Sequence, residues 1–382
     1  MKRLLSQVFA ILFAILLTLS LFEIALRIRP PGWLVYRMAK LHPSSDVTGF
    51  GSDVNWKVDR KNGKFWRFTP GSSFDVVNYE FNAKAHIDAF GGRRTVCDTC
   101  EIAETLPPVV FFGDSFTFGI GIEDDETIPS RLANLASPHR VLNLAIPGSS
   151  LKRHLDILEM RHEELGGPQK YIFALSLNQE FADLIKDKEE TISGPAGQLP
   201  SSPEGLIWTV NNFVYHNAIL KRVYLLQFVR HFALRAIARK DPEGLVSAIF
   251  PVIDMTNTAY HKLSQSVFDE QIERLENLKR KYNFDAAIVA LPNVSQIDPA
   301  VLEHQVSEYG YRLEMLDVSM PNKIFAKGLA NRSIRLIDPT DCIRQHSVGK
   351  NLYFMQDQHF TALGTRVVAD CLRHDLGEYL KN

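Results

Sequence analysis

The chain has 382 residues, of which 45% are hydrophobic and 23% charged, and its 43 basic and 44 acidic side chains give a net charge of −1. This composition excludes a wholly disordered chain, and the charge balance excludes bulk electrostatic binding to nucleic acid. The length allows one large domain or two ordinary ones.

The N-terminal segment is the most apolar part of the chain. After two basic residues, residues 4–26 contain one charged side chain, Glu23. A helix of this length, rising about 1.5 Å per residue, crosses the roughly 30 Å hydrocarbon core of a bilayer. The stretch is longer than a usual signal-peptide core and lacks a convincing cleavage site, which favours an uncleaved signal-anchor over a cleaved signal peptide or a buried core helix. The starting basic residues favour a cytoplasmic N-terminus, although Arg27 and Arg29 compete with them.

The remainder is predicted to be an α/β body behind a membrane anchor at residues 1–30. Residues 31–107 are expected to form a β-rich lead-in packed on the main domain, with a hairpin around Phe65–Phe74. In residues 108–382, apolar runs alternate with amphipathic stretches, as in a βαβ sheet. The predicted strands are 109–112, 141–144, 171–175, 286–291 and 334–337, and the predicted helices are 127–135, 151–165, 261–282 and 362–379. Short, non-alternating apolar runs suit parallel strands buried on both faces.

A helical insertion is predicted between the third and fourth strands, at about residues 185–251. Residues 194–205 are rich in proline, serine and glycine and are expected to form a loop. Residues 211–240 are helix-like and contain no acidic side chain. Their six basic residues are Lys221, Arg222, Arg230, Arg235, Arg239 and Lys240, and all except Arg230 fall in one broad sector of a helix. That sector is either the solvated face of a packed cap helix or a face that meets anionic lipid or polysaccharide.

A serine directly follows the first predicted strand, in Gly113-Asp114-Ser115. Ligands of an open parallel sheet bind in the crevice beyond the carboxyl ends of the strands, so we expect the Ser115 hydroxyl in that crevice. The Ser115 backbone N–H, near a helix N-terminus, could stabilise an oxyanion there. Taken alone, however, Ser115 and Asp114 are each typical of a helix cap.

A base for this serine is expected near the C-terminus, in Asp357-Gln358-His359. A hydroxyl is a weak nucleophile until a base removes its proton. An imidazole can do so near neutral pH, and a carboxylate can fix the tautomer of that imidazole. The candidate triad is therefore Ser115 as nucleophile, His359 as general base and Asp357 as the group that orients it.

Two further strand ends supply candidates for an oxyanion hole. Gly148 follows the second predicted strand, where a glycine lets the backbone approach a ligand and offer its N–H. Asn178 follows the third strand and can donate its side-chain amide to the same oxyanion. Either residue alone would be interpreted as a turn glycine or a helix cap. Their order after successive strands favours an oxyanion hole formed by Ser115, Gly148 and Asn178.

These residues resemble the motifs of the SGNH/GDSL hydrolases, a family named for its Ser, Gly, Asn and His. Gly113-Asp114-Ser115 resembles the first family block, and Gly148 and Asn178 match the glycine and asparagine of the next two. Asp357 with His359 resembles the last block. The resemblance covers residues 109–380 apart from the insertion. It implies a three-layer, flavodoxin-like sandwich with a mainly parallel five-stranded sheet, and a serine mechanism with no cofactor and no metal.

One further segment of the chain resembles the family, and two of its motifs differ from the family pattern. The apolar start followed by Phe22-Glu23-Ile24-Ala25-Leu26-Arg27 resembles membrane-anchored bacterial members of the family. The third block reads Ser176-Leu177-Asn178-Gln179 where Gly-x-Asn-Asp is usual. The last block of the family is often Asp-x-x-His. Here it reads Asp-x-His, which resembles the alginate acetyltransferase-like branch. The second departure favours acyl transfer to a polysaccharide.

The four cysteines form two candidate pairs. Cys97 and Cys100 precede the sheet, which favours a local disulfide or plain thiols over a redox motif or half of a zinc site. Cys342 and Cys371 flank the segment that holds Asp357 and His359. If the body of the chain lies in an oxidising compartment, we expect disulfides 97–100 and 342–371, with buried free thiols as the alternative.

The sequence therefore predicts an outward-facing serine esterase, anchored in a membrane, that acts on an O-acyl substrate through an acyl-enzyme. Its catalytic domain is expected to be periplasmic or extracellular. One alternative is an O-acyltransferase that modifies a cell-surface polysaccharide with the same triad. The other is a non-catalytic glycan-binding scaffold. The expected partners are an ester or acylated glycan and the membrane, without nucleic acid.

Overall fold

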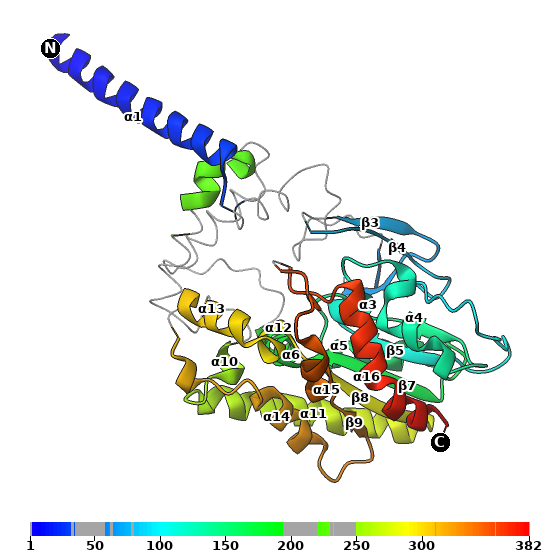
Figure 1. Cartoon of the computed structure of the whole chain (residues 1–382). Coiled ribbons are helices and arrows are strands. Elements are labelled where there is room, and N and C mark those ends of the chain that lie inside the picture. The colour runs from blue at the N-terminus through cyan, green and yellow to red at the C-terminus, as the bar shows by residue number, and fades with distance from the viewer. Residues whose placement is uncertain are drawn as a thin grey trace. The chain divides into compact units, whose positions relative to one another are not determined.

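The structure, a computed structural model of the chain, divides into two compact units, which comprise Met1–Ser45 with Ala196–Leu245 and Asp46–Pro195 with Val246–Asn382. Within them the described residues are 2–31, 34, 58–61, 64–77, 80–193, 220–229, 232, 250–309, 311–355 and 357–381. Figure 1 shows their helices and strands in colour.

The first unit contains the predicted N-terminal helix, α1 (Lys2–Ile28). Within it, Phe9–Ile28 is long and apolar enough to cross a membrane. Of the helix-like stretch 211–240, the structure describes a short 3₁₀ turn, η3 (Leu220–Arg222), a helix at 224–229, and residue 232. The predicted loop at 194–205 lies outside the described residues.

The second unit is built on a five-stranded sheet whose pairings are all parallel, which confirms the predicted fold class. Its strands are β5 (Val109–Gly113), β6 (Val141–Asn143), β7 (Lys170–Ser176), β8 (Asp285–Leu291) and β9 (Arg335–Ile337), in the spatial order β6-β5-β7-β8-β9. All five residues of β5 are buried, because helices cover both faces of the sheet. The predicted positions of the five strands were correct to within about one residue.

The helices form the two outer layers of a three-layer sandwich. One core joins Phe112 and Phe173 of the sheet to α5 (Leu151–Arg161), α6 (Leu177–Ser193), α11 (Thr258–Tyr282) and α14 (Met320–Leu329). The other joins Phe111 and Ile172 to α4 (Ile128–Leu132), α12 (Val294–Ile297), α15 (Thr340–Ser347) and α16 (Ala362–Lys381). Alternate residues of each strand thus enter opposite cores.

Short helices complete the second unit. They are α3 (Ser115–Phe118), η1 (Asp124–Glu126), η2 (Ala133–Leu135), α10 (Phe250–Ile253), α13 (Pro299–Tyr309) and η4 (Leu313–Met315).

The lead-in forms two hairpins, and the predicted hairpin around Phe65–Phe74 was wrong. β2 (Lys64–Phe68) pairs with β1 (Val58–Lys61), and β3 (Ser73–Val77) pairs with β4 (Asn82–His86). Asn62-Gly63, between the paired Lys61 and Lys64, is the dipeptide favoured in two-residue hairpins. In addition, the Phe68 N–H donates to the Gly91 carbonyl at 3.0 Å, so this group is not available to β3.

Candidate active site

Ser115 is the first residue of α3, directly beyond the carboxyl end of β5. A Cβ at Gly113 would clash with Thr117 Oγ1 and with the Ala174 carbonyl oxygen, so glycine is needed where β5 packs this closely against α3 and β7. The Thr117 hydroxyl donates to the same Ala174 carbonyl at 2.8 Å and fastens α3 to β7. From β5 the chain proceeds to β6 on one side and later to β7 on the other, so Ser115 lies where ligands bind in such sheets.

Asp114 caps α3, as the alternative interpretation of this residue predicted. Its carboxylate accepts a hydrogen bond from the Phe116 N–H at 2.9 Å and another from the Ser176 hydroxyl at the end of β7. Burial raises the pKa of the Asp114 carboxyl above its usual value. Sequence reasoning did not identify the Ser176 contact, because Ser176 occupies the position of the glycine that the family motif led us to expect.

A tight loop between α15 and α16 presents His359. Tyr353 and Phe360 pair as an antiparallel bridge, and the Phe354 N–H donates to the His359 carbonyl at 2.9 Å. Gln358, at the tip, has a positive φ of 67°. A Cβ at Gly364 would lie 2.0 Å from the Leu352 carbonyl oxygen, so glycine lets α16 begin directly against this loop.

The fold brings the three candidate triad residues into contact. His359 Nε2 lies 2.8 Å from Ser115 Oγ, and His359 Nδ1 is hydrogen-bonded to Asp357 Oδ1. Ser115 is 6% exposed and His359 5% exposed. The Phe116 ring packs against the His359 ring, with 4.8 Å between the ring centres. This arrangement can transfer the serine proton to the imidazole while the carboxylate holds the ring.

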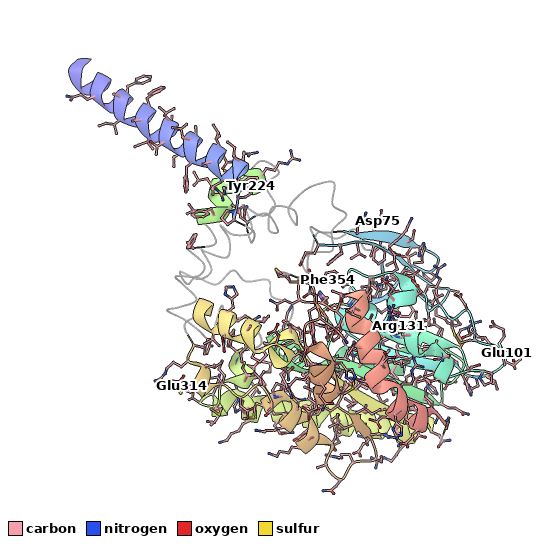
Figure 2. The ribbon with its side chains drawn as sticks, viewed as in Figure 1. Asp75, Glu101, Arg131, Tyr224, Glu314 and Phe354 are labelled. Atoms are coloured by element: carbon pink, nitrogen blue, oxygen red, sulfur yellow. A yellow bond between two sulfur atoms is a disulfide. The ribbon has the colours of Figure 1, made fainter. Side chains whose placement is uncertain are left out.

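Glu80, in the connection between β3 and β4, also contacts the triad loop. Its Oε2 accepts a hydrogen bond from the Asp357 N–H at 2.8 Å. The neighbouring Phe81 packs on Phe354, labelled in Figure 2, with 4.8 Å between ring centres. Sequence reasoning missed Glu80, because it is 277 residues from Asp357 and belongs to no motif.

Gly148 lies in the loop that follows β6 and has a positive φ of 69°. This loop begins beside the turn that leads from β5 to Ser115, because the Ile146 N–H donates to the Gly113 carbonyl at 2.8 Å. Ser149 donates to the Ile146 carbonyl at 2.6 Å, and its Oγ lies 2.7 Å from Nε2 of the buried His154. The loop that carries Gly148 is therefore held against the end of β5.

Asn178 is the second residue of α6, which begins directly after β7. Its side chain lies outside the described residues, so its role as an amide donor stays a prediction.

Carboxyl groups on α6 lie beside the N-terminus of α5. Glu180 is buried and accepts a hydrogen bond from the Leu151 N–H at 2.7 Å, and Asp187 accepts one from Ser150. Burial raises the pKa of Glu180 well above its usual value. Burial, with the nearby Asp114 and Asp187 carboxylates, raises the pKa of Asp183 to about 6.

Both hypothesised disulfides are present, Cys97–Cys100 and Cys342–Cys371. The second joins α15 to α16, on either side of the triad loop. Two groups of metal-ligating side chains occur among the residues that the structure describes. One contains both sulfurs of the 342–371 bridge with His346, and the other is His374, Asp375 and Glu378 on α16. Neither group includes a member of the triad.

No family model matches the chain, and no curated protein matches its sequence. Solved structures with a similar fold include the psychrotrophic esterase EstA from Pseudoalteromonas sp., at 11% identity and a TM-score of 0.37, covering 72% of this chain and 100% of that chain. A putative lipolytic protein of the G-D-S-L family from Desulfitobacterium hafniense is 12% identical, with a TM-score of 0.35, covering 70% and 99% of the two chains. An acetylxylan esterase from Geobacillus stearothermophilus is 14% identical, with a TM-score of 0.32, covering 71% and 94%.

Proposed function

We propose that the chain is a serine esterase of the SGNH/GDSL type that cleaves an O-acyl ester through an acyl-enzyme. The observation that carries this proposal is the hydrogen-bonded series from Ser115 through His359 to Asp357. The family motifs at Ser115, Gly148, Asn178 and His359 support it independently.

In the proposed reaction, Ser115 Oγ attacks the ester carbonyl carbon while its proton passes to His359 Nε2. Asp357 stabilises the imidazolium that forms. The oxyanion is held by the N–H groups of Ser115 and Gly148 and by the Asn178 amide. His359 then returns the proton to the leaving alcohol, and a water molecule, activated by the same imidazole, releases the acid and restores Ser115.

An O-acyltransferase is the second candidate, because the same acyl-enzyme can pass its acyl group to a sugar hydroxyl instead of water. The Asp-x-His spacing of Asp357 and His359 favours this outcome through its resemblance to the alginate acetyltransferase-like branch. A glycan-binding scaffold is disfavoured, because binding alone requires no serine–imidazole–carboxylate series.

We further propose that α1 anchors the chain in a membrane, with the catalytic body outside the cytoplasm. The apolar span Phe9–Ile28 and the two disulfides support this topology, because disulfides persist in oxidising compartments. The proposed domains are the anchor at 1–30, the lead-in at 31–107 and the SGNH domain at 108–382, with its insertion at about 185–251.

Product analysis on the purified full chain tests the activity and separates the two candidates. Acetyl-ester donors are supplied with and without oligosaccharide acceptors. Free acetate alone indicates a hydrolase, whereas acetylated oligosaccharide indicates a transferase. Ser115→Ala should abolish both products, His359→Ala should do nearly the same, and Asp357→Asn should leave a residual rate. Near-full turnover by a folded Ser115→Ala variant would contradict the mechanism.

A further inference from the structure

Glu23, the one acidic residue of α1, is bound to a distant part of the first unit. Its two carboxylate oxygens accept hydrogen bonds from the N–H groups of Tyr224 and Leu225, at 3.1 and 2.6 Å. These are the first two residues of the helix at 224–229. The Glu23 side chain is only 19% exposed, although it is the one charged side chain of residues 4–26. Its charge therefore caps a second helix instead of facing solvent.

Three further contacts join the last turns of α1 to residues 222–228. Arg27, which also pairs with Glu23 at 2.7 Å within α1, donates to the Arg222 carbonyl at 3.0 Å and lies over the ring of Tyr224, which Figure 2 labels. The Phe22 ring meets the Phe228 ring edge to face, with 5.7 Å between centres.

The depth of this junction matches that of an interfacial helix. Glu23 precedes the end of the apolar span at Ile28 by about 8 Å along the helix axis. The apolar face of a helix lying on a membrane is buried roughly 5–10 Å, at the boundary between headgroups and acyl chains. A helix capped by Glu23 therefore lies at the level of that boundary when α1 spans the bilayer.

The exposed side chains have the composition that this location requires. Val229 is 54% exposed and Phe232 47% exposed, so this segment presents apolar surface outward. Arg29 and Arg222 are exposed as well. Exposed apolar and cationic side chains in a segment bound to a membrane-spanning helix favour contact with acyl chains and anionic headgroups.

We propose that residues 220–229, together with Phe232, belong to an interfacial segment that lies in the surface of an anionic bilayer and is locked to the anchor by Glu23. This inference rests on the proposed membrane anchoring and is independent of the proposed catalysis. It gives this part of the insertion a lipid partner, with Arg222 as its described basic side chain.

Depth-dependent quenching tests the proposal on the full chain in nanodiscs of phosphatidylcholine and phosphatidylglycerol. Environment-sensitive fluorophores are placed in three variants: Val229→Cys, Leu16→Cys in α1, and Val348→Cys, which is 84% exposed in the second unit. A lipid spin label near the headgroup should remove most of the fluorescence at position 229. A label at the acyl-chain end should quench position 16, and position 348 gives the response of an exposed fluorophore in the second unit. Replacing phosphatidylglycerol with phosphatidylcholine should weaken quenching at 229.

The Glu23→Ala substitution should reduce quenching at 229 severalfold and leave position 16 unchanged. Thr18→Ala, which removes only a hydroxyl bonded within α1, is the matched control and should change neither. Quenching at 16 without quenching at 229 would leave the anchor standing and overturn the interfacial segment. A blue-shifted but unquenched label at 229 would indicate a protein partner and also overturn it. Loss of quenching at 16 would overturn both the membrane anchor and the interfacial segment. Ester turnover by the same preparation tests the catalytic proposal separately.

Discussion

At the scale of single residues, the backbone N–H of Asp357 is held by a group from another part of the chain. Glu80 accepts this hydrogen bond at 2.8 Å, and Asp357 in turn bonds to His359. A hydrogen bond to a charged acceptor contributes about 1.5–3 kcal/mol. We therefore expect Glu80 to act as a positioning residue for the proposed triad.

The Glu80→Ala substitution should lower kcat about tenfold or more, with little change in KM, because Asp357 loses its support. Glu80→Gln keeps an oxygen acceptor and should restore most of the rate. Exposed Glu101, labelled in Figure 2, supplies the control Glu101→Ala. Equal loss in the Ala and Gln variants would exclude this role.

Asn178 is the proposed side-chain donor of the oxyanion hole. Loss of one preorganised oxyanion donor usually costs about 10²–10³ in kcat. The Asn178→Ala variant should therefore lose rate by that factor while KM changes little, as measured in steady-state ester hydrolysis. A change confined to KM would make Asn178 a substrate-binding residue instead.

The raised pKa of Asp183 predicts that the free energy of unfolding depends on pH. Its pKa, usually 3.8, is raised to about 6 in the folded chain. The folded state thus holds this proton more tightly than the unfolded state, and the associated stability is lost as pH rises from about 4 through 6. Asp183→Asn should then be more stable than the wild type above pH 6, by about 1–3 kcal/mol, with a smaller gain near pH 4.

Urea unfolding at both pH values measures this difference. Asp75→Asn, at an exposed position labelled in Figure 2, is the control. A gain that is the same at both pH values would rule out titration of Asp183 as its cause.

At the scale of elements, the Cys342–Cys371 disulfide closes the segment that carries the triad loop. Its sequence separation of 29 residues corresponds to about 3–4 kcal/mol of stability from reduced chain entropy, against about 2 kcal/mol for the short Cys97–Cys100 loop. The double variant Cys342→Ser/Cys371→Ser should therefore lose more unfolding free energy in urea than Cys97→Ser/Cys100→Ser. The reverse order would show that loop closure does not set these contributions.

Elements of the main sheet could be predicted because their sequences carry strong local signals. Val109-Val110-Phe111-Phe112 is apolar throughout, as a strand buried on both faces requires. The lead-in strands lack such runs, so turn chemistry decides their pairing, and the Asn62-Gly63 signal was overlooked. Ser115, Asp357 and His359 were found through motif chemistry. Glu80 was not, because its contact to Asp357 depends on tertiary structure alone.

In the whole molecule, one set of contacts supports the proposed membrane association and a separate set supports the proposed catalysis. In the first unit, Glu23 joins the apolar helix to residues of the insertion. In the second, Glu80 joins the lead-in to the triad loop. In both units, residues that are distant in sequence make the contacts that hold the functional groups. Sequence motifs therefore predicted the triad residues but not Glu80 or the contacts of Glu23.

Covalent labelling shows directly whether His359 activates Ser115 as a nucleophile. The full chain is treated with a fluorophosphonate, digested and mapped by mass spectrometry. We expect a single adduct on Ser115, absent in Ser115→Ala and strongly slowed in His359→Ala, because the hydroxyl then lacks its base. Absence of an adduct from the folded wild type, or an adduct on Ser149 or Ser150 in its place, would show that Ser115 is not the activated nucleophile.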